Sequence, residues 1–501
     1  MRKWILGAAA MAALLASSPA HAQAAASSAQ GGGANQKALQ LMLQKGVITQ
    51  AEYDAAIVQV NEVTVKESSQ TVVVEAEKKG PPPVTSKWNA TMYGFVEADY
   101  MFDSTQSFQD LAGNGFIARG ETYAALNHRM QYSIRNTRLG FRMNSPEWGG
   151  VKSSAVMEMD FFGNQPGTPP AYSEASYYNN PTFRIRHAYL KLESPVIDFL
   201  FGQTWELFGW QGYFHPNTVE LQGVSGQVYS RTAQLRVSKT IKGDAVSLDI
   251  ALDASRPPQR DSYVPDLQGG LKLSLNGWKG VTTNGGTGTN IVPFAIGVSG
   301  SLRRFQVQEP VAINPAPSLH SAVAQGWGYD IDILVPIIPV SDNNRANGLT
   351  FTGSFVNGRG INDFYTGLTG GATAANSGLT APQADAALVG EVGFGADGHL
   401  RTIAWRSFII GLQYYFPGDG RFWVSADYSN MYSSNVQFFG TAAGTFYRSN
   451  WAEANMFFDA TNAIRLGLGY SWYRQYGTQA NGTTPITGTN NRVQLSAWYL
   501  F

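Results

Sequence analysis

The 501-residue sequence contains no cysteine, only 14% charged residues and, after its N-terminus, no long apolar run. Without cysteine, no disulfide can stabilise an exported chain of this size, so its stability must have another origin. No later segment approaches the roughly 18 uncharged apolar residues that a membrane-spanning helix needs. The formal net charge of 0 also lacks the basic excess that nucleic-acid binding normally requires. The sequence therefore predicts neither a helical membrane protein nor a nucleic-acid-binding protein.

Residue patterns for catalysis or metal binding are missing as well. The six histidines are scattered, without the spacing of a metal site. Residues Ser341–Asn344 and the Asp397-Gly398 pair fit turns better than calcium loops, because the closing glutamate is absent. No histidine is followed two residues later by serine, as in a barrel phospholipase, and no Asp-His pair suggests an omptin-like protease. We therefore expect no enzyme activity, no metal site and no cofactor.

The first residues have the pattern of a secretory signal peptide. Arg2 and Lys3 precede a short apolar run, Trp4–Leu15, and Ala20-His21-Ala22 provides a small-x-small cleavage site. We assign residues 1–22 to this signal.

Residues 23–87 predict a small helical extension followed by a linker. Two short helices, Asn35–Gln44 and Thr49–Val60, are separated by Gly46, and the Gly80–Pro83 stretch stiffens the chain before the next domain. A hairpin this small buries too little apolar surface to be stable alone. We expect it to lie in the periplasm and to depend on other copies of itself or on another partner.

Alternation of apolar and polar residues dominates the rest of the chain. In the final stretch, Asn491–Phe501, every second residue from Val493 to Phe501 is apolar, and the other face carries Arg492, Gln494, Ser496 and Trp498. Side chains alternate faces in a strand, so this is a ribbon with one apolar face. About ten residues are also what a tilted strand needs to cross a bilayer.

Residues 88–501 repeat this pattern, and the fold class we predict is all-β. It is a 16-stranded antiparallel transmembrane β-barrel with a short N-terminal helical periplasmic extension. The connections alternate between short and long, and an even strand number puts both ends of the barrel on the periplasmic side. Two connections, 276–290 and 336–348, are longer than this alternation predicts. The strands are expected at 90–102, 133–143, 151–161, 182–191, 197–205, 231–239, 245–253, 267–275, 292–305, 327–335, 349–356, 403–416, 421–429, 451–458, 464–473 and 492–501.

A barrel of sixteen strands encloses a water-filled lumen. Strand alternation places several arginines on the inner face, where a dry core would not tolerate them. They suit carboxylates or phosphates because the guanidinium is planar and always charged. In the alternative interpretation, these arginines pair with nearby acids and only solvate the wall. The candidate pore-lining arginines are Arg138, Arg142, Arg184, Arg186 and Arg236.

The aromatic-rich segment Glu206–Tyr229 follows the fifth predicted strand. An exposed loop with this aromatic density would be costly, which favours a loop folded into the lumen as an eyelet. Its Glu206 and Glu220 would then face the arginines. An ordinary outer loop is the alternative.

Several stretches resemble a known family, the DcaP-like porins. They are Met92–Tyr100, Asn136–Arg142, Arg186–Tyr189 and Phe201–Trp205. The resemblance implies a trimeric outer-membrane barrel, preceded by a periplasmic segment and associated with small dicarboxylates. The Lys45–Thr49 stretch instead resembles the short hairpin that precedes phosphate-selective porins, so the substrate class stays open.

The C-terminus resembles the last strand of Gram-negative outer-membrane barrels, in which a terminal phenylalanine is the assembly signal. This resemblance implies that Tyr499 and Phe501 are read by the barrel assembly machinery. We therefore predict an outer-membrane porin whose partners are lipid, two further copies of the chain and small hydrophilic solutes, with small anions such as dicarboxylates favoured. A phosphate-selective porin, a general sugar or nutrient porin and, more remotely, a structural or adhesin-type barrel are the alternatives.

Overall fold

The chain divides into two compact units, Met1–Lys87 and Trp88–Phe501, in a computed structural model. The predicted signal peptide and helical extension lie outside the described residues, apart from Lys45, and stay predictions. The residues that the structure describes are Lys45, 89–163, 182–257, 262–309, 320–341, 344–366, 368, 391–395, 397–436, 439, 446–477 and 486–501.

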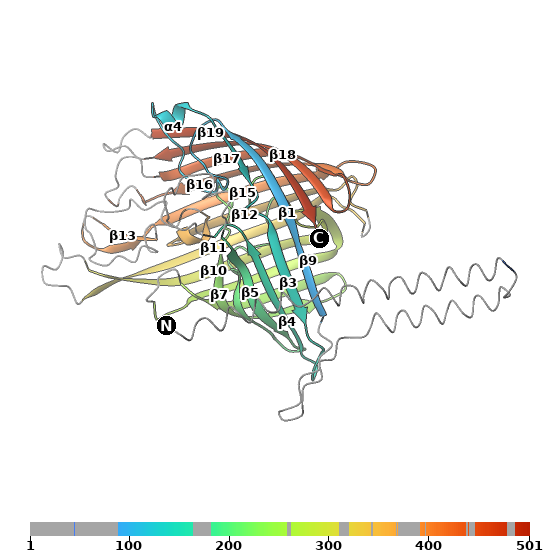
Figure 1. The fold of residues 1–501 in the computed structure, drawn as a ribbon. Helices are drawn as coiled ribbons and strands as arrows, with labels where there is room; N and C mark the ends of the chain where they lie inside the picture. Colours follow the sequence, from blue (N-terminus) through green and yellow to red (C-terminus); the bar gives the residue numbers. More distant parts are fainter. Residues whose placement is uncertain are drawn as a thin grey trace, which may run out of the picture. The chain divides into compact units, whose positions relative to one another are not determined.

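The regular secondary structure in the described part of the second unit is almost entirely antiparallel strand (Figure 1). Two short helical turns, α4 (Tyr123–Leu126) and η1 (Asn362–Phe364), lie in the loops. No helix among the described residues is long and apolar enough to cross a membrane. The strands are β1 (Asn89–Asp103), β2 (Arg129–Ser133), β3 (Arg138–Asn144), β4 (Lys152–Asp160), β5 (Arg184–Glu193), β6 (Asp198–Trp205), β7 (Arg231–Lys242), β8 (Val246–Ser255), β9 (Asp266–Thr282), β10 (Asn290–Gln308), β11 (Ser321–Ile338), β12 (Leu349–Arg359), β13 (Val392–Phe394), β14 (Leu400–Thr402), β15 (Ala404–Tyr415), β16 (Phe422–Ser433), β17 (Phe446–Asp459), β18 (Ile464–Gly477) and β19 (Ile486–Leu500).

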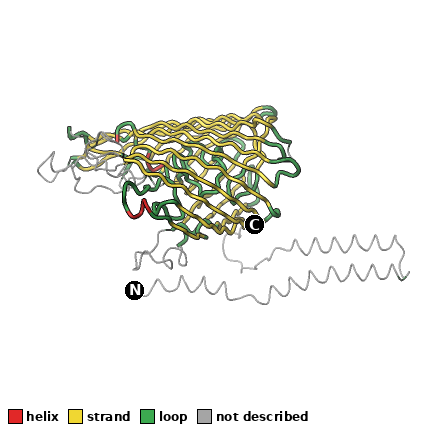
Figure 2. Tube along the Cα trace, turned by 90° about the horizontal axis from the view of Figure 1, so that it is seen from above, coloured by secondary structure: helices red, strands yellow, loops and turns green. Residues whose placement is uncertain are grey.

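The main sheet closes on itself into a barrel. Each strand pairs with its neighbours in chain order, and β1 pairs with β19 in a register that places Ala98 opposite Ala497. Strands β2 and β3 both pair with β1 and belong to one crossing, so the 17 strands of the sheet make sixteen crossings. The predicted 16-stranded barrel is confirmed. Long connections gather at one end, the loop end, and short turns at the other, the turn end (Figure 2).

The two faces of the strands follow the predicted alternation. In β1, Val96 is 52% exposed on the outer surface, whereas Phe95 and Glu97 on either side of it are buried inside. In β19, Tyr499 is exposed and Trp498 is buried. An apolar outer face is what a strand needs where lipid surrounds the barrel.

The seam of the barrel depends on a glycine. Gly94 in β1 exchanges backbone hydrogen bonds with Phe501, at 3.0 and 3.1 Å. Its φ is +155°, and a Cβ atom there would lie 2.1 Å from the carbonyl oxygen of Arg138. Only glycine, which lacks that atom, allows β19, β1 and β3 to come together here.

Both connections that seemed too long contain strand residues: about half of 276–290, but only the first three residues of 336–348. Strand β9 continues to Thr282 and β10 begins at Asn290, with a register shift between Pro293 and Phe294. A second shift lies between Pro336 and Ile338 in β11. Each bulge interrupts the period-2 alternation, so the pattern ended the strands too early. The short pair β13–β14 in the loop after β12 was not predicted at all.

Candidate functional site

The loop between β6 and β7, residues 206–230, lies inside the barrel. Its backbone amides donate to wall side chains on both sides: Phe208 to Gln268 of β9 at 2.8 Å, and Val219 to Asn455 of β17 at 3.2 Å. Ser425 of β16 in turn donates to the carbonyl of loop residue Asn217 at 2.6 Å. These contacts cross the lumen, so the eyelet interpretation of this segment is confirmed.

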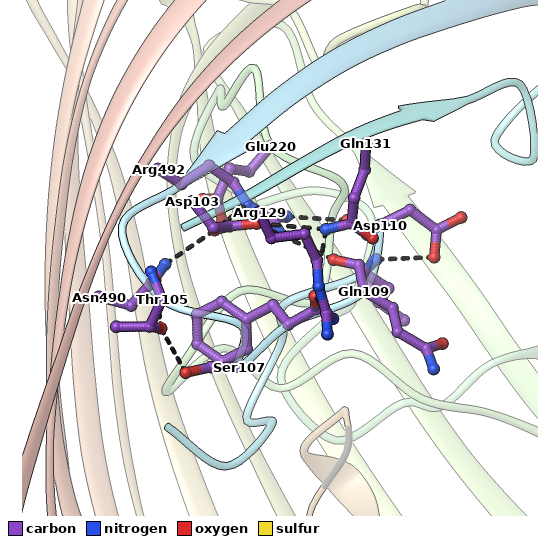
Figure 3. Close-up of polar contacts among 12 residues, drawn as sticks. Asp103, Thr105, Ser107, Gln109, Asp110, Arg129, Gln131, Glu220, Asn490 and Arg492 are labelled. Atoms are coloured by element: carbon purple, nitrogen blue, oxygen red, sulfur yellow. Dashed lines mark hydrogen bonds and ion pairs between the residues drawn. The ribbon is translucent and has the colours of Figure 1, made fainter. Parts of the chain in front are cut away.

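The first loop, residues 104–128, also enters the lumen, which the sequence did not indicate. Arg492 of β19 holds it through a two-pronged ion pair with Asp103, at 2.9 Å for both contacts (Figure 3). The same guanidinium donates to the carbonyls of Gln109 and Asp110 at 2.6 and 2.8 Å. This loop is rich in small polar residues, and nothing in its pattern separates an inward path from an outward one.

Described residues of the lumen line two cavities that share part of their walls. The larger, about 400 Å³, lies towards the loop end, and the smaller is about 140 Å³. Both are lined by Asn136, Arg186, Gln222 and Tyr229, so these side chains stand at the boundary between the two spaces. The larger cavity also has Arg184 and Arg231 in its wall, and the smaller has Arg138 and Glu97.

Three of the predicted arginines share two acids on β4. Arg186 contacts Glu158 at 2.8 Å and Asp160 at 3.0 Å. Arg184 contacts Asp160 at 2.6 Å, and Arg138 contacts Glu158 at 3.4 Å. Three arginines against two carboxylates leave a positive excess, so these charges pair, but not completely; whether the arginines select anions stays a prediction.

Arg231, the first residue of β7, adds a further positive charge that the sequence did not indicate. It forms no ion pair with any described acid, and its Nη1 atom has no hydrogen-bond partner in the described part of the chain. Its guanidinium stacks instead on Trp205 at 4.5 Å and Tyr229 at 5.3 Å from the ring centroids. Alternation along β7 would turn Arg231 outward, but at the end of a strand the side chain is free to turn in.

Two loop groups beside these arginines have displaced pKa values. Burial alone would raise the pKa of the Tyr229 hydroxyl, but Arg186, Arg231 and Arg138 outweigh it and lower the pKa to about 7. Burial lowers the pKa of His215 to about 3, with Arg231 and Arg186 acting in the same direction. His215 therefore stays neutral and adds no charge to the site.

Acidic residues on the opposite wall are covered by the loop. Asp330 and Asp332 of β11, Asp427 of β16 and Glu453 of β17 are all at most 5% exposed, and none pairs with a described basic residue. Loop residue Gly209 approaches Asp330 so closely that a Cβ atom would lie 2.7 Å from Oδ2. None of the four lines either cavity. We call them the covered acidic wall.

The remaining predicted site residues are spread around the lumen. Arg142 lies over the Tyr93 ring towards the turn end, and Arg236 pairs with Asp253 at 3.4 Å; neither lines a cavity. Glu206 is buried beside Gln268 and also lines neither. Glu220 borders the smaller cavity, but its carboxylate accepts hydrogen bonds from Ser471 and Tyr473 of β18. Whether these residues meet a solute stays a prediction.

No group of three or more metal-ligating side chains occurs among the described residues. The donor set of the site is instead guanidinium, phenol and amide, which suits anions and polar solutes.

Comparison with known proteins supports the fold. No protein-family model and no curated protein matches the sequence. Among solved structures, the outer membrane channel DcaP of Acinetobacter baumannii is 18% identical, covering 83% of this chain and 97% of its own, with a TM-score of 0.56. The trimer form of OmpT, an outer membrane protein of Vibrio cholerae, is 10% identical over 83% and 99%, with a TM-score of 0.45. The anion-selective porin from Comamonas acidovorans is 9% identical over 83% and 100%, with a TM-score of 0.44.

Of these three, only the DcaP channel exceeds a TM-score of 0.5, and at this identity it establishes the fold alone. The second unit has the fold of a 16-stranded outer-membrane porin barrel, and the predicted resemblance to the DcaP-like porins is confirmed at that level.

Proposed function

We propose that this chain forms a water-filled diffusion channel in the Gram-negative outer membrane, and that the channel favours small anions such as dicarboxylates. The apolar outer face, the closed sixteen-crossing sheet and the inward eyelet loop support a channel. Solutes would pass the two cavities in sequence, from the larger at the loop end to the smaller.

One observation carries the proposed anion preference. The larger cavity has Arg184, Arg186 and Arg231 in its wall, and its one acidic residue, Asp363, is engaged by Arg303 at 2.5 and 2.7 Å. Charges held beside low-dielectric walls act more strongly on a passing ion than they would in bulk water. A dianion gains from two guanidinium contacts in succession, whereas a neutral sugar gains little.

Recordings in planar lipid bilayers under a salt gradient test this proposal. Replacing both Arg184→Gln and Arg231→Gln should shift the reversal potential towards cations and lower the anion-to-cation permeability ratio by about tenfold. The matched control replaces Arg401→Gln and Arg421→Gln, which pair with exposed acids away from both cavities. An unchanged permeability ratio in the first variant would mean that these arginines line the lumen without affecting ion selectivity.

The same bilayers decide the substrate class. If a dicarboxylate reduces the chloride current at lower concentration than phosphate, the dicarboxylate assignment stands. Preferential block by phosphate would favour the phosphate-selective alternative, and equal permeation of a neutral sugar would favour a general nutrient porin.

Assembly of the channel is proposed to need the C-terminal residues. Tyr499 and Phe501 are exposed on the outer face of the strand that closes the barrel. Replacing Phe501→Ser should reduce the amount of protein inserted in the outer membrane, without changing the conductance of the channels that do form.

We also propose a homotrimer with the extension of residues 23–87 in the periplasm. Mass measurement of the detergent-purified protein should give three chains, and deleting residues 23–85 should lower the temperature at which trimers dissociate. A monomer alone would contradict this assignment.

A further inference from the structure

One turn at the turn end is folded into the barrel, while two others, 145–151 and 416–421, stay outside. The turn of residues 283–289 joins β9 to β10, and its Thr283 and Gly286 are buried. By contrast, the turns 145–151 and 416–421 are exposed along almost their whole length. The inward turn therefore differs from these two in burial and not in length, since 145–151 is as long as 283–289.

Polar contacts fix this turn to the eyelet loop and to the wall. The amide of Gly285 donates to Asn217 Oδ1 of the loop at 3.1 Å. Arg465 of β18 donates to the carbonyls of Gly285 and Thr287, and its Nε is held by Asp459 at 2.9 Å. One buried guanidinium thus satisfies two carbonyls of the turn, which makes Arg465 its positioning residue.

An aromatic surface on the wall receives the middle of the turn. A Cβ atom at Gly286 would lie 2.6 Å from the ring of Trp498 and 2.8 Å from that of Phe95. Phe457 follows Trp498 at 6.2 Å and Trp423 follows Phe457 at 5.1 Å, between ring centroids. The absence of a side chain at Gly286 is what allows the backbone to lie against this surface.

The turn completes the smaller cavity. Residues 284–287 line it on one side and loop residues 218–220 and 222 on another, with Arg138 and Arg186 also in the wall. The narrow space is therefore bounded by a loop that enters from one end of the barrel and by a turn that enters from the other.

We propose that the turn of residues 283–289 is a second constriction element, which limits the size of the solutes that leave the arginine-lined space towards the turn end. This inference rests on the proposed channel function. The eyelet loop and the arginines then set charge preference, while the inward turn sets the size limit.

Cysteine labelling tests this inference directly, because the chain has no cysteine of its own. Thr287→Cys places a thiol on the cavity, and Glu147→Cys places one in the exposed turn 145–151 as a matched control. A bulky water-soluble thiol reagent should lower the single-channel conductance of the first variant by about half and leave the second unchanged. Mass spectrometry of each variant measures the extent of labelling.

Either of two results would overturn the proposal. In the first, Thr287→Cys is fully labelled but its conductance stays the same, so the turn does not border the passage. In the second, Thr287→Cys stays unlabelled while Glu147→Cys reacts, so the turn cannot be reached from the water-filled space.

Shortening the turn gives an independent test, in which the conductance should rise instead of fall. Replacing residues 283–289 by Asn-Gly between the paired residues Thr282 and Asn290 makes a two-residue hairpin turn. Conductance should rise about twofold and larger neutral sugars should enter liposomes, with ion selectivity retained because the arginines are untouched. The control shortens 146–150 to Asn-Gly. Equal size limits in the two shortened channels would contradict the proposal.

Failure of the channel function is a separate result. If the unmodified protein gives no conductance after insertion into bilayers, the proposed function is wrong. If the unmodified protein conducts and the turn variants have the same conductance and size limit as it has, the channel function stands and only the second constriction is wrong.

Discussion

The two sides of the barrel interior differ in the residues that they present: arginines of one side line the larger cavity, whereas the covered acidic wall on the other side lines neither cavity. Arg184, Arg186 and Arg231 line the larger cavity. The covered acidic wall lies beneath the eyelet loop; Glu453, for example, accepts a hydrogen bond from the amide of Glu220 at 3.2 Å. The wall of the larger cavity is therefore basic, whereas the smaller cavity has two arginines, Arg138 and Arg186, and two glutamates, Glu97 and Glu220.

The physical reason is that the effect of a wall charge on a solute depends on the distance between them and on the dielectric of the material that separates them. The interaction of a solute with a wall charge falls with separation, and charges at the surface of a cavity dominate over those behind a layer of packed backbone. The loop therefore separates the four acids of the covered acidic wall from both cavities.

Reversing a charge on the basic side should have the largest effect. Arg231→Glu changes the larger cavity by two charges at a residue without an acidic partner, so the anion-to-cation permeability ratio should fall by more than about tenfold. Reversal potentials in asymmetric salt measure it. Arg401→Glu, an equal change at an exposed loop position, is the control, and equal shifts in the two variants would remove the special role of the basic wall.

Removing the hydrogen-bond donors of a loop acid should have a smaller effect of the opposite sign. Burial raises the pKa of Glu220, and Ser471 and Tyr473, which both donate to its carboxylate, offset part of this rise. In a Ser471→Ala, Tyr473→Phe variant the pKa of Glu220 should rise further, so this acid at the smaller cavity carries less negative charge and anion preference should increase by up to about threefold. Glu220→Gln alone should give the same increase; if it does not, the acid is not responsible.

Selectivity should also depend on pH through Tyr229. Because the arginines lower its pKa to about 7, the phenol loses its proton as pH rises from 6 to 8 and adds a negative charge beside Arg186. Anion preference should therefore decrease about twofold over this range. In Tyr229→Phe, the reversal potential should no longer change with pH.

A second loop group needs its own control in that experiment. Burial raises the pKa of Glu206 to about 8, so it titrates in an overlapping range although it lines neither cavity. Glu206→Gln should keep the pH dependence. If Glu206→Gln loses it and Tyr229→Phe keeps it, the assignment is reversed.

Neutralising the covered wall should have the smallest effect. Asp427→Asn removes a carboxylate that is 5% exposed and lines neither cavity, so the reversal potential should stay within a few millivolts of the unmodified protein. The melting temperature of the variant checks that it folds. A shift as large as that of Arg231→Glu would show that the loop does not screen this wall.

Much of the fold could be predicted because the bilayer imposes a strict rule on the sequence. A strand that faces lipid on one side and water on the other must alternate, and Val96 beside Glu97, or Tyr499 beside Trp498, shows this one residue at a time. The same rule predicted the number of strands and the inward orientation of the Arg138 and Arg186 side chains. It failed where the backbone leaves the period of two, at the bulges beside Pro293 and Pro336.

The sequence by itself determined the barrel, its closure by the last strand, the inward eyelet loop and most of the arginines inside. Only the tertiary structure decided which of the inward charges reach the passage. Arg231 enters from a strand end, the first loop is drawn in by Arg492, and the turn 283–289 is held by Arg465. Each of these depends on contacts between residues far apart in the chain, and alternation along a single strand carries no information about them.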